Sequence, residues 1–146
     1  MDKLIILPVI LPLIAGLLFI LLRSYIKIQR SFSLVTLGAL IIISIMMMLH
    51  IQTNGILTMQ LGNWQAPFGI GLVADMFSVL LVLTTSIIAF CCVMFAFKTI
   101  GKEREEFYFY PLFLFLITGV NGSFLTGDLF NLYVFFEVLL LASYVL

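Results

Sequence analysis

Five uninterrupted apolar stretches constrain the fold of this chain more than any other feature. They cover residues 4–22, 32–51, 72–97, 107–125 and 129–146. A helix needs about 20 apolar residues, at about 1.5 Å each, to cross the hydrocarbon core of a bilayer. The stretches are continuous and do not alternate between apolar and polar residues, so they predict helices and not the strands of a closed barrel. We therefore predict an all-α, polytopic membrane protein with five transmembrane helices.

The composition supports a location in the lipid bilayer and excludes several classes of function. Hydrophobic residues make up 64% of the chain and charged residues only 10%, whereas about a quarter of the residues of a soluble domain are charged. So little charge excludes a water-soluble enzyme and a nucleic-acid-binding protein. The sequence contains no phosphate-binding loop, no Cys/His metal spacing and no paired nucleophile and base. We accordingly expect no enzyme activity, no cofactor and no metal site.

The basic residues predict how the helices are oriented in the membrane. Six of the seven fall in the first and third connections, namely Arg23, Lys27, Arg30, Lys98, Lys102 and Arg104. With five crossings, these two connections lie on the same side, and the positive-inside rule places them in the cytoplasm and the N-terminus outside. The connection over residues 52–70 has no Lys or Arg. Its residues Trp64 and Phe68 predict an external cap at the lipid interface.

The last apolar stretch differs from the others at its end. Residues 129–146 run to the final position without a polar cap or a flanking basic residue, although a helix normally ends on one of these signals. We therefore expect the chain to be truncated at its C-terminus. No repeat, low-complexity segment or soluble domain is visible, and residues 1–146 are predicted to form a single membrane unit.

One acidic residue lies deep within a predicted helix. Asp2 and the glutamates of residues 103–106 are expected in water, but Glu137 follows the start of its helix by nine residues, or about 13 Å, near the bilayer midplane. A carboxylate at that depth costs about 2.5–3.5 kcal/mol and must face protein or water. Tyr133 and Tyr144 share its helical face. Glu137 is either a proton relay or a protonated group that links two helices by hydrogen bonds.

Two aspartates are predicted near the outer ends of helices. Asp75 is either an N-cap or the first residue of a polar stripe. The other members of that stripe are Ser78, Thr85 and Ser86, which line a hydrated path or hold helices together. Residues 121–128 are predicted to form a turn in which Thr126 or Asp128 caps the last helix. The alternative role of Asp128 is an external carboxylate at which ions enter.

Two segments resemble a known family. One is residues 61–70 followed by Ala74 and Asp75, and the other begins at Tyr110 and continues to Leu140. They are similar to the D subunit of Mrp-type multisubunit cation/proton antiporters, also called Mnh sodium/proton antiporters. The Phe-Phe-Glu core that contains Glu137 is shared with the antiporter-like subunits of complex I. The run over residues 119–131 points to the D subunit in particular, and the match corresponds to roughly the first third of a family member.

This resemblance implies a many-helix subunit with two inverted repeats, each with a broken helix. Such a subunit works with sister subunits in a bacterial plasma membrane to exchange cytoplasmic sodium for external protons. The expected partners are therefore other subunits, protons, a monovalent cation (sodium is expected) and the lipid bilayer. In the family, the glutamate that matches Glu137 pairs with a lysine on a later helix, which lies beyond Leu146.

Two other functions remain open at this point. The chain is alternatively a proton-pumping subunit of a redox-driven complex, such as complex I or a membrane-bound hydrogenase, because both classes use the same embedded glutamate. The third possibility is a scaffold that conducts no ions. If the chain is a scaffold, a neutral hydrogen-bonding residue can replace Glu137 without loss of activity.

Overall fold

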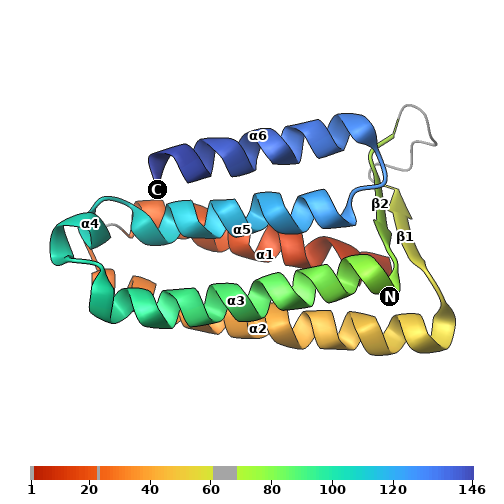
Figure 1. The fold of residues 1–146 in the computed structure, drawn as a ribbon, viewed down its shortest axis with the longest axis horizontal. Coiled ribbons are helices and arrows are strands. Elements are labelled where there is room, and N and C mark those ends of the chain that lie inside the picture. The colour runs from red at the N-terminus through yellow and green to blue at the C-terminus, as the bar shows by residue number, and fades with distance from the viewer. Residues whose placement is uncertain (1, 23, 61–68) are drawn as a thin grey trace.

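The structure, a computed structural model, describes residues 2–22, 24–60 and 69–146 (Figure 1). Helices dominate these residues, and one small hairpin lies at an end of the helical bundle. The elements in chain order are the 3-10 helix η1 (Asp2–Ile6), α1 (Leu7–Leu21), α2 (Ile26–Asn54), β1 (Leu57–Gln60), β2 (Gly71–Ala74), α3 (Met76–Thr99), α4 (Lys102–Glu106), α5 (Phe109–Leu125) and α6 (Leu129–Val145).

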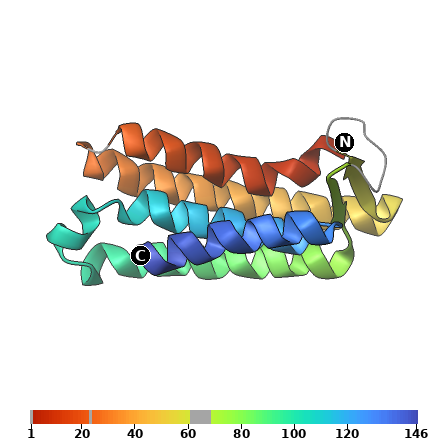
Figure 2. The same cartoon turned by 90° about the horizontal axis from the view of Figure 1, so that it is seen from above.

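The long helices lie side by side in an elongated bundle, with α5 at its centre. Helix α5 packs against α1, α3 and α6, while α2 packs against α1 and α3. Helix α6 forms an outer layer whose main contact is with α5 (Figures 1 and 2). This arrangement leaves one side of α6 open.

The outer surface of the bundle is apolar, which is the reverse of a soluble protein. Leucine, isoleucine and phenylalanine side chains cover it, and Leu21 is 82% exposed. Three helical segments are long and apolar enough to cross a membrane: Leu4–Leu21, Ile26–Asn54 and Met76–Thr99. Helices α5 and α6 are apolar and 17 residues long, at the short end of the range for a span. The all-α membrane fold and its five apolar helices are thus as predicted.

The predicted start of the third apolar helix is wrong, because a hairpin precedes that helix. Residues 72–74 were expected to begin the third apolar helix, but they belong to β2, which pairs antiparallel with β1. Backbone pairing with a strand that lies earlier in the chain overrides their apolar character, and Asp75 then has the extended backbone of an N-cap. Trp64 and Phe68, on which the predicted external cap depended, lie outside the described residues.

Helix α2 is longer than its apolar stretch. It begins at Ile26, six residues before the predicted start, and its 29 residues make about 43 Å, against a hydrocarbon core of about 30 Å. We therefore expect the polar first turns to extend beyond the lipid. Gln29 is buried there and donates Nε2 hydrogen bonds to the carbonyls of Phe19 and Leu22. Both carbonyls lie at the end of α1, where the usual helical N–H donors run out, and the Leu22 carbonyl also accepts from the backbone N–H of Tyr25.

The two segments predicted as basic connections lie at one end of the bundle, although Lys27 and Arg30 belong to α2 and Lys98 to α3. The α1–α2 connection and α4 are found together there, whereas the hairpin and the N-terminus lie at the opposite end (Figure 1). The predicted pairing of the two connections is confirmed. Which end faces the cytoplasm remains a prediction, and Arg23 lies outside the described residues.

Candidate functional site

Glu137 lies in the middle of α6, eight residues or about 12 Å from its first residue. The side of α6 that faces α5 carries Phe135 and Leu139. Glu137 is exposed, on the side that α5 does not cover. No ion pair joins it to a cation in the described part of the chain. The structure thus places an embedded carboxylate on the open side of an apolar helix.

The two predicted tyrosines differ in their relation to Glu137. Tyr133 is 63% exposed, and its hydroxyl interacts with the Glu137 carboxylate one turn away. Tyr144 is 85% exposed, and no hydrogen bond joins it to Glu137 within the described ranges. The structure therefore brings one of the two hydroxyls to the carboxylate.

Glycines on α5 fix the position of α6. A Cβ atom at Gly119 would lie 2.8 Å from the backbone nitrogen of Leu139, which is closer than real Cβ contacts. A Cβ atom at Gly122 would overlap the ring of Phe135. Small residues allow two membrane helices to approach closely. These two glycines therefore set how near the helix that carries Glu137 lies to the bundle.

A buried asparagine joins the other side of α5 to α1. Pro12 lies inside α1 and has no N–H, so the carbonyl of Pro8 lacks its normal helical donor. Asn121 is fully buried and donates an Nδ2 hydrogen bond of 3.1 Å to that carbonyl. Asn121 was predicted to lie in a turn, but it lies within α5, which continues to Leu125. The turn itself is only residues 126–128.

Asp75 and Asp128 are N-caps, as their positions predicted. Asp75 accepts a 2.7 Å hydrogen bond from the backbone N–H of Ser78, whose hydroxyl accepts one from the Asp75 backbone N–H. The backbone N–H of Ser78 is the main cause that lowers the pKa of the Asp75 carboxyl. Asp128 accepts from the N–H groups of Phe130 and Asn131. Their further roles in an ion path remain predictions.

The two serines of the predicted polar stripe along α3 form hydrogen bonds within their own helix. The Ser78 hydroxyl donates to the carbonyl of Asp75, and the buried Ser86 hydroxyl donates to Val82. Thr85 is half-buried. For the described residues, none of the three hydroxyls has a hydrogen bond to another helix. That the stripe lines a hydrated path therefore remains a prediction.

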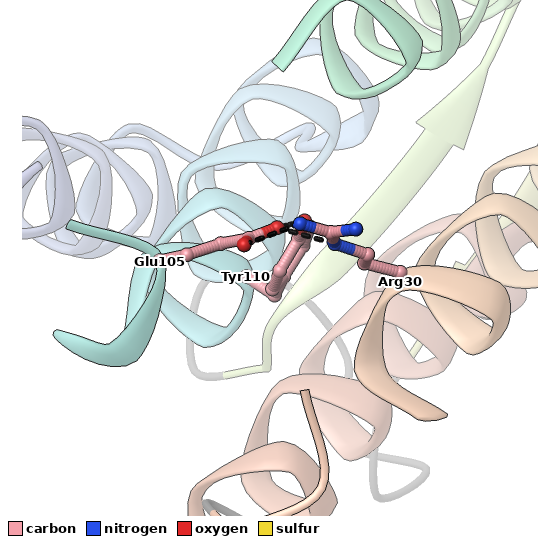
Figure 3. Close-up of polar contacts among 3 residues, drawn as sticks. All are labelled: Arg30, Glu105 and Tyr110. Atoms are coloured by element: carbon pink, nitrogen blue, oxygen red, sulfur yellow. Dashed lines mark hydrogen bonds and ion pairs between the residues drawn. The ribbon is translucent and has the colours of Figure 1, made fainter. Parts of the chain in front are cut away.

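An ion pair at the basic end of the bundle was not predicted. Arg30 of α2 donates from Nε and a terminal nitrogen to the two carboxylate oxygens of Glu105, each at 2.6 Å (Figure 3). The Tyr110 hydroxyl donates to the same carboxylate, and the guanidinium lies 5.7 Å from the centre of the Phe97 ring. This Arg30 cluster joins α2, α3, α4 and α5.

The expectation that Glu105 lies in water is therefore wrong. Its side chain is 2% exposed, whereas that of Arg30 is 37% exposed. Hydrogen bonds from Arg30 are the main cause that lowers the pKa of Glu105, and they outweigh the opposing effect of burial. The local sequence gives no signal for this pair, because the two residues are 75 positions apart.

Comparisons with known proteins show what the chain is similar to. No family model matches it. It is 51% identical over 146 residues to the D subunit of a Na(+)/H(+) antiporter from Alkalihalophilus pseudofirmus, and 45% identical to the protein of the same name from Bacillus subtilis. The resemblance to antiporter D subunits is confirmed. Each match includes the whole chain but only 30% of the relative, so the chain spans about 30% of the length of these curated relatives.

Solved structures of membrane complexes share the fold. The Mrp complex from Dietzia sp. DQ12-45-1b matches 98% of this chain and 26% of its own, with a TM-score of 0.90 and 30% identity. The membrane-bound sulfane sulfur reductase, an archaeal respiratory membrane complex, matches the whole chain and 30% of its own, with a TM-score of 0.85 and 27% identity. The fold of this chain thus occurs both in the Mrp complex and in a respiratory complex.

Proposed function

We propose that this chain is part of a membrane subunit of a multisubunit cation/proton antiporter, in which Glu137 takes up and releases protons. The observation that carries the proposal is a single carboxylate in the middle of an apolar helix, on the side that the described bundle leaves open. The names of the antiporter relatives support exchange of sodium for protons. The proposed partners are sister subunits, protons, sodium and the lipid of a bacterial plasma membrane.

The proton affinity of such a carboxylate depends on its surroundings. A low-dielectric environment disfavours the charged form and raises a carboxyl pKa, while a cation that approaches within about 4–6 Å favours the charged form. A cation that moves toward or away from Glu137 would thus make the group release or bind a proton. In this proposal the Tyr133 hydroxyl, which interacts with the carboxylate, passes that proton along α6.

The test replaces Glu137 by a side chain of the same shape that cannot bind a proton. Glu137→Gln keeps the size and hydrogen-bonding atoms but cannot bind a proton, whereas Glu137→Asp keeps the chemistry on a shorter side chain. We expect Gln to abolish sodium-driven proton movement in everted vesicles, and Asp to retain part of it with a changed pH profile. Glu106→Gln, the same change at an exposed glutamate, is the matched control. Exchange at the wild-type rate in Glu137→Gln, normalised to assembled complex, refutes the relay and favours a scaffold.

A redox-driven proton pump is the second candidate function. The likeness to the sulfane sulfur reductase complex favours it, because that respiratory complex shares the fold at a TM-score of 0.85. The two candidates differ in the energy source. Proton movement that needs an electron donor and ignores a sodium gradient supports the pump, and movement driven by sodium alone supports the antiporter.

The orientation forms part of the proposal. The basic end of the bundle, which includes Lys27 and Lys98, is assigned to the cytoplasm and the N-terminus to the outside. Single cysteines at Lys98 and at the exposed Ile56, in the connection between α2 and β1, provide the test in a variant that lacks Cys91 and Cys92. An impermeant thiol reagent applied to intact cells should label only the cysteine in the connection. Labelling of the cysteine at Lys98 alone would mean that the orientation is the opposite one.

A further inference from the structure

A cleft of about 390 Å³ opens between α2 and α3 at the basic end of the bundle. Its lining residues are Lys27, Arg30, Ser31, Leu34 and Phe97. Two of these side chains are cationic and one carries a hydroxyl, and the other two are apolar. The cleft shares Arg30 and Phe97 with the Arg30 cluster, but the Glu105 carboxylate is not part of its lining.

The polar part of the cleft suits an anionic phosphate group. Lys27 and Ser31 are exposed, and no carboxylate pairs with Lys27 in the described part of the chain. Glu105 already balances the charge of Arg30, so the net positive charge of the cleft comes from Lys27. The guanidinium has five N–H donors, of which the Glu105 carboxylate takes two. Arg30 therefore offers further donors from a position that Glu105 and Phe97 hold fixed.

The apolar part of the cleft points to a lipid and not to a soluble ligand. Along α2, Leu34 is seven residues, or about 10 Å, further from the helix start than Lys27, and Phe97 is its neighbour on α3. The first turns of α2 extend beyond the apolar span, so the basic residues lie at the depth of the headgroups and Leu34 lies at the depth of the acyl chains. From the start of α2 inward, the cleft presents charged and then apolar side chains. A phospholipid has its charged headgroup and its acyl chains in the same order.

We infer that this cleft binds one anionic phospholipid, with its phosphate at Lys27, Ser31 and Arg30 and an acyl chain along Leu34 and Phe97. Basic pockets between membrane helices are a recognised kind of lipid headgroup site. The inference depends on the membrane location of the bundle and is independent of the proton-relay proposal.

The experiment measures lipid binding to the intact protein in detergent by native mass spectrometry. Phosphatidylglycerol is the probe, and phosphatidylcholine and inorganic phosphate are the comparison ligands. Lys27→Gln removes the net charge from an exposed position, so the fold is retained. We expect it to weaken phosphatidylglycerol binding about fivefold, the effect of roughly 1 kcal/mol per basic residue near a membrane surface. Lys27→Arg should restore binding.

The matched control is Lys98→Gln, which removes one exposed charge at the same end of the bundle from a residue that does not line the cleft. It should leave phosphatidylglycerol binding unchanged. Equal weakening in both Gln variants would mean general surface charge and would overturn the site. Equal binding of phosphatidylcholine, or competition by inorganic phosphate at the same concentration as the lipid, would overturn the lipid as its ligand.

Discussion

Removal of either partner of the Arg30–Glu105 pair should have unequal effects on stability. Arg30→Met leaves the carboxylate of Glu105 almost fully buried, with Tyr110 as its remaining hydrogen-bond partner. Glu105→Gln leaves a guanidinium that is 37% exposed and is therefore partly solvated. The two substitutions break the same contact, but they leave behind charges in different environments.

The expected magnitudes follow from this difference in burial. Breaking a buried pair by removing one partner costs about 3–5 kcal/mol, and the partial exposure of Arg30 places Arg30→Met at about 3 kcal/mol. Glu105→Gln keeps a hydrogen-bonding side chain beside Tyr110, so it should cost about 1 kcal/mol. The double variant should cost about 1–2 kcal/mol, because it leaves no buried charge without a partner. That is less than the sum of the single variants and reveals their coupling.

The assay is reversible unfolding of the intact protein in mixed micelles, followed by circular dichroism across a pH series. The pKa of Glu105 is lowered by Arg30, so the pair contributes its full stability above the ordinary glutamate pKa of about 4.3. This contribution is lost as the pH falls through the lowered pKa of the folded state. The gap between wild type and Arg30→Met should therefore be widest near neutral pH and shrink at acid pH. Equal costs for the two single variants, or a gap independent of pH, would show that the burial of the Glu105 carboxylate does not determine the stability of this pair.

Substitutions at three further positions test other contacts of the bundle by the same unfolding assay. Gly122→Ala should cost about 1–3 kcal/mol, because its Cβ would overlap Phe135, and an unchanged stability would show that α5 and α6 are not so close. Asn121→Ala should cost about 1–3 kcal/mol by leaving the Pro8 carbonyl without its donor, whereas a silent result would contradict that bond. Asp75→Ala should cost about 1 kcal/mol and Asp75→Asn much less, since Asn also caps helices; equal costs would argue against capping.

Features with local causes could be predicted from the sequence. The five helices follow from apolar runs long enough to cross a bilayer, and the caps at Asp75 and Asp128 follow from single residues next to those runs. Glu137 was identifiable because one carboxylate interrupts an apolar stretch. Its place on the open side of α6 was not, because that depends on which side of the helix α5 covers.

Features that depend on distant residues could not be predicted. Strand β2 forms because Gly71–Ala74 pairs with Leu57–Gln60, and nothing within the apolar run signals a strand. Glu105 was predicted to be solvated because it lies in a charged run, and only the fold brings Arg30 and Tyr110 to it. The early start of α2 was missed for another reason, since hydropathy marks where the lipid ends and not where the helix ends.

The central claim is that Glu137 binds and releases a proton during turnover. Infrared difference spectroscopy of the intact complex in membranes, as sodium is added, measures this most directly. The C=O stretch of a protonated carboxyl should change in wild type and in Glu106→Gln, and this change should be absent in Glu137→Gln. The same carboxyl signal in Glu137→Gln as in wild type would assign the proton to another group and contradict the account.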